Sequence, residues 1–217
     1  MSNRGNLTVY DVSRETLLLA RDRYNEDRDR NEYYLDSLLW WNERVNLVSR
    51  NVSRETLREH IIHSLLPDAL SLFDEEARWV DAGTGGGLPG IPLALANPQK
   101  EWVLNDVVQK KIVAVRQIAH LSGLENVVLA NSSVEVLRFD GTVGVVSKHA
   151  FSVMKLLDLI SGLKWSRIVM YKGVEESVEE CKEISPSLSL QLFRFQFGQE
   201  ESFYQEKGLL VVDRTDN

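Results

Sequence analysis

The sequence has little cysteine, no long apolar run and no excess of positive charge. Its single cysteine, Cys181, excludes an intramolecular disulfide and is consistent with a reducing cytoplasm. No apolar run approaches the ~20 residues that a membrane span requires, and the polar first residues do not resemble a signal peptide. We therefore expect a cytoplasmic protein that does not enter a membrane.

The charge balance is acidic, with a formal net charge of -7. Binding to nucleic acid is therefore not indicated by the total charge and would need a local basic patch. The 217 residues, 43% of them hydrophobic, are enough for one large domain or a domain with an appendage. His60 and His63 lie one helical turn apart without a third candidate ligand, so we expect no metal site. We also expect a monomer.

Residues 1–75 show helical signals only, and we predict an N-terminal helical cap there. Ser13 and Ser53 are candidate N-caps, each followed by the same Arg-Glu-Thr-Leu sequence. Between them, Tyr34, Leu38, Trp41 and Val45 recur at helical spacing. We expect Tyr34, Trp40 and Trp41 to pack in the core.

From residue 76 to 217, short β-branched runs alternate with helical patterns. This alternation predicts an α/β fold with a doubly wound, mostly parallel sheet. The end of the chain differs, because "LSLQLFRFQF" alternates with a period of two and "KGLLVVDR" follows a polar loop. We predict that these two runs form an antiparallel hairpin that closes the sheet edge.

The stretch "WVDAGTGGGLPGIPLALA", residues 79–96, places five glycines within eight positions after a predicted strand. A phosphate-binding P-loop is excluded, because Leu88 and Pro89 stand where Lys and Ser or Thr are needed. A dinucleotide fingerprint fits Gly85, Gly87 and Gly90 only as a weak match. The alternative is the loop of S-adenosylmethionine-dependent methyltransferases, with an acid at the strand end followed by alternating glycines: Asp81, Gly83, Gly85 and Gly87. Asp81 beside a cationic sulfonium is favourable, whereas beside a pyrophosphate it would be repulsive.

Two further segments follow the next predicted strands, and ligands of doubly wound sheets bind at these strand ends. Asp106 is placed to accept hydrogen bonds from ribose hydroxyls, and the less favoured alternative is that it caps the helix that follows. Ser132, Ser133, Val134 and Glu135 follow the third strand of the alternation, where Val134 would offer an apolar contact to an adenine.

The chain resembles the glucose-inhibited division protein B family of bacterial methyltransferases, which act on guanine N7 of 16S ribosomal RNA. The resemblance rests on "WNERVNLVS", "HIIHSLLP", the glycine loop, "LNDVVQKKIVAVRQIAHLSGLENV", "SSVEV", "VVSKHAF" and "MYKG", in the family's order from about residue 35 to 173. It implies a Rossmann-like methyltransferase sheet and S-adenosylmethionine as cofactor. It also implies that Gly83, Leu88, Val134 and Glu135 line the cofactor, with Asp106 facing its ribose, and that the partner is 16S ribosomal RNA or a precursor of the small ribosomal subunit.

Three positions depart from the family pattern. The family has Ser-Arg-Ala-Phe where this chain has "SKHAF", which places His149 at the Arg position and Lys148 beside it. His63 replaces an Asp in "HIIHSL". The closing strand of the family ends with two apolar residues followed by Ile-Lys, and here Asp213 and Arg214 stand at the last two positions. Unlike Arg, a neutral His carries no charge and forms no planar fork.

Methylation of guanine N7 removes no proton, so we expect no general base. Lys148, His149 and Lys172 are candidates for positioning the base or contacting phosphate, and we hypothesise that Lys148 and His149 act jointly on the RNA. His149 is also counted among the candidate cofactor-binding residues. Basic residues for RNA occur in two sets: Arg44, Arg50, Arg54 and Arg58, and Lys110, Lys111 and Arg116.

Three other functions stay open from the sequence. The chain could methylate a different RNA or a small molecule, or it could be a non-catalytic module that binds RNA or the cofactor. A dinucleotide-dependent oxidoreductase is disfavoured by Asp81 and by the helical segment before the sheet.

Overall fold

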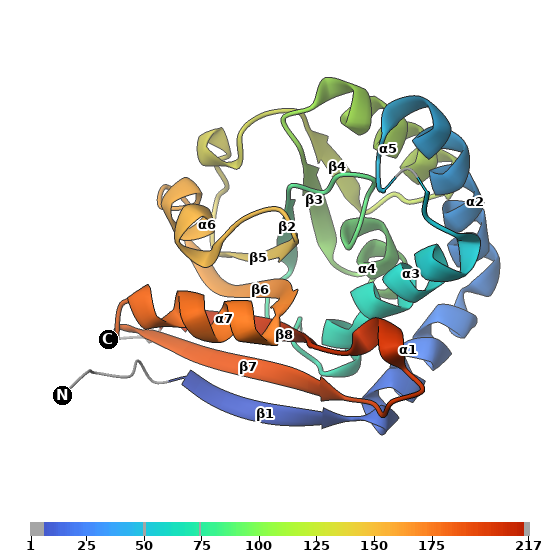
Figure 1. The fold of residues 1–217 in the computed structure, drawn as a ribbon. Coiled ribbons are helices and arrows are strands. Elements are labelled where there is room, and N and C mark those ends of the chain that lie inside the picture. Colours follow the sequence, from blue (N-terminus) through green and yellow to red (C-terminus); the bar gives the residue numbers. More distant parts are fainter. Residues whose placement is uncertain (1–6, 50, 74, 215–217) are drawn as a thin grey trace.

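The computed structural model describes residues 7–49, 51–73 and 75–214. Within them, eight strands form one sheet in the order β1-β7-β8-β6-β5-β2-β3-β4 (Figure 1). The strands are β1 (Leu7–Ser13), β2 (Arg78–Ala82), β3 (Glu101–Asn105), β4 (Val127–Ala130), β5 (Val143–Lys148), β6 (Trp165–Gly173), β7 (Leu188–Gln196) and β8 (Lys207–Arg214). Only β8 runs antiparallel to its neighbours, which confirms a mostly parallel sheet.

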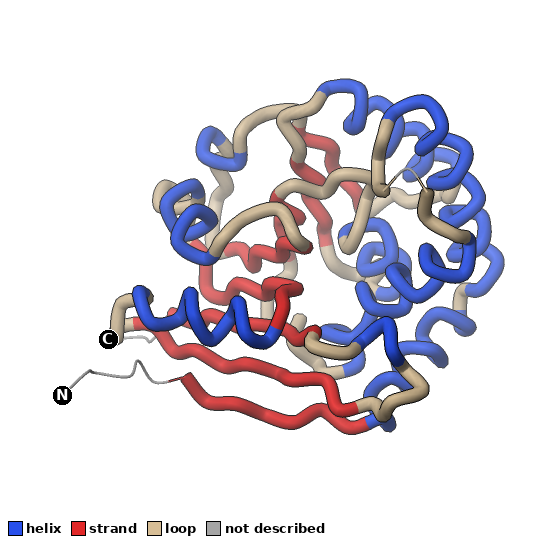
Figure 2. Tube along the Cα trace, in the orientation of Figure 1, coloured by secondary structure: helices blue, strands red, loops and turns tan. Residues whose placement is uncertain are grey.

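Helices cover both faces of the sheet, as the tube drawing makes clear (Figure 2). They are α1 (Arg14–Glu26), α2 (Arg28–Val45), α3 (Arg54–Ala69), α4 (Gly90–Ala96), α5 (Gln109–Leu121), α6 (Val153–Leu159) and α7 (Val174–Glu180). Buried side chains of α1 to α5 share one apolar cluster with Trp79 and Trp102 of the sheet. A second cluster joins α6 and Cys181 to the opposite face. Layers of this kind follow from the β-branched runs of the central strands, which are buried on both sides.

The helix starts predicted at the two serines are present. Ser53 caps α3 with its side chain, which accepts a hydrogen bond from the Thr56 backbone N–H at 3.1 Å. Ser13 precedes α1 but makes no such bond, and its hydroxyl donates to Glu15 instead. The division of the chain at residue 75 stays a prediction.

The expectation that residues 1–75 contain helices only is wrong, because β1 is a strand. It pairs in parallel with β7, from Leu7 opposite Leu190 to Ser13 opposite Gln196. Only Val12 of this strand is buried. Because the strand has no buried face, it does not need the alternation of apolar and polar residues by which a strand is recognised in a sequence. The strand that pairs with β1, namely β7, comes from the far end of the chain.

The predicted C-terminal hairpin exists, since β7 and β8 pair antiparallel. It does not close the sheet, because β1 lies outside β7 and forms the edge. Asp213, one of the departures from the family pattern, is explained by this arrangement. It lies opposite Arg167 in the β6–β8 register, and its carboxylate accepts a hydrogen bond from the Arg167 Nε at 2.7 Å.

Two aromatic expectations hold and one does not. Tyr34 is fully buried and Trp41 is partly buried against the core. Trp40 is 51% exposed, and the Arg44 guanidinium lies 3.7 Å from its ring centroid. Its position on α2 faces outward, away from the buried stripe of that helix. None of the described helices is long and apolar enough to cross a membrane.

Candidate active site at the carboxyl edge of the sheet

Two adjoining cavities open at the carboxyl ends of β2, β3 and β5. The larger has a volume of about 630 Å³ and the smaller about 340 Å³. Five residues line both: Leu47, Gly83, Gly85, Lys148 and His149. Asn105, Asp106 and Val134 belong to the larger cavity, and Val48, His60 and Leu88 to the smaller. The structure thus brings most of the predicted site residues to one place.

The glycine loop after β2 is held by backbone hydrogen bonds and is open toward the cavities. The N–H groups of Gly83 and Thr84 both donate to the Asn105 carbonyl at 2.9 Å. Gly83 and Gly85 have φ values of +76° and +57°, a region that side-chain-bearing residues avoid. A Cβ on Gly85 would meet nothing closer than 3.6 Å, so its bare backbone faces free space. The loop is therefore shaped to let a ligand approach the main chain.

Gly87 serves packing within the loop. It does not line either cavity, and a Cβ there would come within 2.7 Å of Ile91. Helix α2 also holds the loop, because the Tyr34 hydroxyl donates to the Gly86 carbonyl at 3.0 Å.

Asp81 lies beneath the glycine loop and lines neither cavity. It is fully buried, and its carboxylate accepts a hydrogen bond from the Gly90 N–H at 2.9 Å. Burial raises the pKa of this carboxyl to about 7. The structure therefore places it as the anchor of the α4 N-terminus and does not place it at the wall where a sulfonium would lie.

Asp106 lines the larger cavity and joins two loops. One carboxylate oxygen accepts a hydrogen bond from the Gly85 N–H at 3.1 Å, and the other accepts from the Val108 N–H at 2.8 Å. The helix that follows starts after Val108, so Asp106 is not its N-cap residue. Each oxygen keeps a further lone pair for a donor in the cavity.

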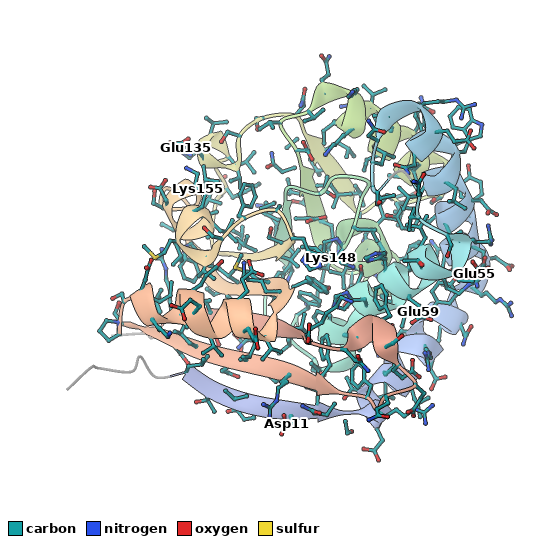
Figure 3. The ribbon with its side chains drawn as sticks, viewed as in Figure 1. Asp11, Glu55, Glu59, Glu135, Lys148 and Lys155 are labelled. Carbon is teal, nitrogen blue, oxygen red and sulfur yellow. The ribbon has the colours of Figure 1, made fainter. Side chains whose placement is uncertain are left out.

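The segment after β4 contributes Ser133 and Val134 to the larger cavity. Val134 is buried there, as an apolar contact for a planar ring requires. Glu135 is exposed and lies at the periphery of the molecule, away from both cavities (Figure 3). Asn105 fixes this segment, since its side-chain amide donates to the Ala130 and Ser132 carbonyls at 3.2 and 2.8 Å.

Residues 47–49 form a wall that the sequence did not assign to the site. Asn42, near the end of α2, donates to the Ser49 carbonyl at 3.0 Å and accepts from the Val48 N–H at 2.9 Å. This clamp positions Leu47 on both cavities. The "WNERVNL" stretch was the available signal, because an Asn three residues before the end of a helix is suited to bind the chain beyond it.

Lys148, at the end of β5, points inward toward α3 and is 9% exposed (Figure 3). Its ammonium donates to the His60 carbonyl at 2.8 Å and to the Ser64 hydroxyl at 3.1 Å. Burial lowers the pKa of this amine to about 7. A lysine held in this way does not reach an RNA phosphate on the surface, so the expected joint action with His149 on RNA is not supported.

His149 is exposed at the mouth of both cavities, with a φ of +56°. Partial desolvation, followed by the charge of Lys148, lowers the pKa of its imidazole. His63 lies deeper and is fully buried among the rings of Tyr171, Phe195 and Tyr204, with no hydrogen bond to either ring nitrogen. Its burial lowers the pKa of the ring well below the usual value, which keeps it neutral at pH 7.

Lys172 lines neither cavity and is 4% exposed. Its ammonium pairs with Glu176 at 2.7 Å and Glu180 at 3.1 Å, and it donates to the Phe151 carbonyl at 3.4 Å. Phe151 lines the larger cavity, so Lys172 supports the wall of the cavity without entering it.

The candidate basic residues divide into paired and free sets. Arg54 and Arg58 both form ion pairs with Glu32. Lys110 and Arg116 are exposed on α5, and no ion pair joins them to another described residue. Lys111 lines the larger cavity beside Asp106, and Arg50 lies outside the described residues. Among the described residues, no group of three or more His, Cys, Asp or Glu side chains could hold a metal ion.

Comparison with known proteins gives a family and a fold. The model of the GidB family, described as rRNA small subunit methyltransferase G, matches residues 28–201. Ribosomal RNA small subunit methyltransferase G of Christiangramia forsetii is 32% identical over 207 residues, which cover 89% of this chain and 92% of that protein. The protein of the same name from Chlorobium luteolum is 37% identical over 145 residues, 67% of this chain and 58% of that protein. The chain thus matches less than two thirds of the length of this second relative.

Solved structures agree on the fold. A putative O-methyltransferase from Klebsiella pneumoniae superposes with a TM-score of 0.56 at 13% identity, over 84% of this chain and 90% of that one. The putative methyltransferase yhhF from Escherichia coli gives a TM-score of 0.52 at 15% identity, over 78% of this chain and 91% of that one. The sheet is therefore of the Rossmann-like methyltransferase type, and the chain belongs to the GidB family of rRNA small subunit methyltransferases.

Proposed function

We propose that this protein is a cytoplasmic, S-adenosylmethionine-dependent methyltransferase that methylates N7 of a guanine in 16S ribosomal RNA. The observation that carries the proposal is the open glycine loop beside Asp106, in a chain of the GidB family. The two relatives named above carry ribosomal RNA in their names, which supports RNA as the substrate. The acting unit in this proposal is the monomer.

The larger cavity fits the nucleoside half of the cofactor. Asp106 offers carboxylate oxygens for ribose hydroxyls, and Val134 offers a buried apolar surface for a base. Gly85 leaves the main chain open where the cavities adjoin, so the reacting group belongs there.

When bound, S-adenosylmethionine supplies an electrophilic methyl group. Guanine N7 offers a lone pair in the plane of the ring and carries no proton, so the protein need not provide a base. What the chain provides is position and exclusion of water, and alignment of two reactants alone can lower a barrier by about 7–11 kcal/mol. Leu47 and Leu88 give the smaller cavity apolar walls, and His149 stands at its mouth, where the RNA would approach.

The substrate is tested by transfer of labelled methyl groups to small-subunit RNA. RNA from a strain that lacks this gene should accept label, and mass mapping should find one N7-methylguanine that only the gene-bearing strain contains. Cofactor binding without any transfer to this RNA would instead support a different substrate or a non-catalytic binding module.

The cofactor is tested by calorimetry with S-adenosylhomocysteine and NAD. We expect S-adenosylhomocysteine to bind and NAD not to bind. Binding of NAD without a response to S-adenosylhomocysteine would reject the methyltransferase proposal in favour of a dinucleotide site.

A further inference from the structure

The strongest unexplained feature of the molecule is the buried ammonium of Lys148. Its two hydrogen-bond acceptors, the His60 carbonyl and the Ser64 hydroxyl, are both neutral. No ion pair within 4 Å joins it to a carboxylate of a described residue. The Tyr171 ring centroid lies 5.2 Å away, and the Asp81 carboxylate acts on it only from a longer distance. A buried ammonium without a carboxylate in direct contact is costly, and an anion beside it would remove most of that cost.

The position of Lys148 shows where such an anion would come from. It is one of the five residues that line both cavities, so its side chain borders ligand space at the point where the cavities adjoin. A lysine ammonium has three N–H donors. Two of those of Lys148 are used, and both point toward α3. The third is available to a ligand.

We propose that Lys148 binds the carboxylate of the amino-acid part of the cofactor, and so anchors the end opposite the adenine. This inference rests on the proposed cofactor and adds a residue to its site. An RNA phosphate fits less well, because Lys148 lies under the loops and not on the outer surface. The O6 atom of a guanine fits less well too, since a neutral acceptor would leave the ammonium without a counter-ion.

The neighbouring charges agree with this role. The groups that face Lys148 from the packed elements are Asp81 of β2, His60 and His63 of α3, His149, Tyr171 of β6 and Lys207 of β8. Asp81 is the one carboxyl among them, and it is used by the Gly90 N–H and lies outside both cavities. The histidines have lowered pKa values, which keeps them neutral at pH 7, so none of them competes for an anion.

The binding should be linked to proton uptake. Burial lowers the pKa of free Lys148 to about 7, and a bound carboxylate raises it again. At pH 8 the free amine is mostly neutral and the bound one is charged, so binding takes up a proton. At pH 6 the amine is charged in both states, so the uptake disappears.

The test compares two ligands that differ in the amino-acid part. S-adenosylhomocysteine has the carboxylate, and 5′-methylthioadenosine lacks the whole amino-acid tail. In Lys148→Met we expect the affinity for S-adenosylhomocysteine to fall about 10- to 100-fold, the usual weight of a charge-assisted hydrogen bond. The affinity for 5′-methylthioadenosine should change less than about threefold.

Lys100→Met is the matched control. Lys100 is 8% exposed and donates to the Glu76 carbonyl at 3.0 Å. It lies just before β3, at the amino end of that strand, whereas the cavities open at the carboxyl ends of the strands. It should bind both ligands as the wild type does. Thermal unfolding without ligand shows that each variant is folded.

Calorimetry of the wild type in buffers of different ionisation enthalpy needs no variant. Uptake that is larger for S-adenosylhomocysteine than for 5′-methylthioadenosine at pH 8, and absent at pH 6, supports the proposal. Equal losses for both ligands in Lys148→Met, no loss for either, or no difference in proton uptake would overturn it. Failure of the wild type to bind S-adenosylhomocysteine at all would reject the proposed cofactor itself.

Discussion

Gly85 is the residue at which the glycine loop meets both cavities, and its substitution tests the site directly. We predict that Gly85→Val stays folded but loses measurable affinity for S-adenosylhomocysteine. A valine at a φ of +57° is strained by about 1–2 kcal/mol, and its side chain would enter the free space beside the backbone.

Gly123→Val is the control that introduces the same backbone strain without placing a side chain in the ligand cavities. Gly123 has a φ of +66° with nothing within 4 Å of an added Cβ, and it lines neither cavity. Calorimetry should find normal ligand affinity in this control, together with a similar loss of stability. If Gly85→Val binds as tightly as the wild type, the glycine loop is not the cofactor site.

His149 is the residue where the chain departs from the family at the mouth of the site. We predict that His149→Arg preserves or raises methyl transfer to small-subunit RNA at pH 7. The imidazole is neutral there because desolvation and Lys148 lower its pKa, whereas an arginine is charged and can contact an anion.

The measurement for His149→Arg is the rate of labelled methyl transfer, with cofactor affinity as its control. Cofactor affinity should stay within a few-fold of the wild type. A large loss of transfer at unchanged affinity would show that the neutral ring is itself required.

At the scale of elements, the end of α2 and the segment after it act together. We predict that Asn42→Ala lowers the free energy of unfolding by about 1–3 kcal/mol, because two hydrogen bonds to residues 48 and 49 are lost. It should also weaken binding of S-adenosylhomocysteine, since Leu47 then loses its fixed place on the cavity wall. Urea unfolding and calorimetry measure the two effects.

Asn126→Ala is the control for Asn42→Ala. The Asn126 amide donates to three carbonyls, those of Ala94, Asn97 and Lys100, in a region that lines neither cavity. Its loss should lower stability without changing ligand affinity. Equal weakening of binding in both variants would contradict a specific role for the Asn42 clamp.

At the scale of the whole molecule, the half-buried His60 and the buried His63 predict sensitivity to acid. Burial lowers the pKa of His60 to about 3 and that of His63 well below its usual value. In the unfolded chain both titrate near 6.5, so the unfolded state binds more protons below that pH. Their contribution is therefore fully present above about pH 6.5 and is lost as the pH falls toward the folded pKa values.

We predict that the free energy of unfolding falls between pH 6.5 and pH 4 by up to about 1.4 kcal/mol per pH unit for each histidine. His63→Leu should reduce this slope, because it replaces a buried ring without hydrogen-bond partners by an apolar side chain. His120→Leu, at an exposed position on α5, should keep the wild-type slope. Urea unfolding at several pH values measures it, and an unchanged slope in His63→Leu would show that another group causes the acid sensitivity.

The sequence by itself determined the alternation of strands and helices, the start of α3 at Ser53 and the place of the glycine loop. These features depend on neighbours within a few residues, namely periodicity, capping and the conformational freedom of glycine. It also determined where the site lies, because the carboxyl ends of parallel strands meet at one edge of the sheet.

Only the tertiary structure decided the pairing of β1 with β7, the burial of Asp81 beneath the loop and the inward direction of Lys148. Two of these depend on a segment far away in the sequence: β7 for β1, and α3 for Lys148. The partner of Asp81, Gly90 at the start of α4, lies nine residues further along the chain, but the loop between them has to fold back to bring the two together. A charged residue at a strand end reads the same in the sequence whether it faces solvent or a helix. Which of the two it faces is set by what packs against the strand, and that packing is long-range.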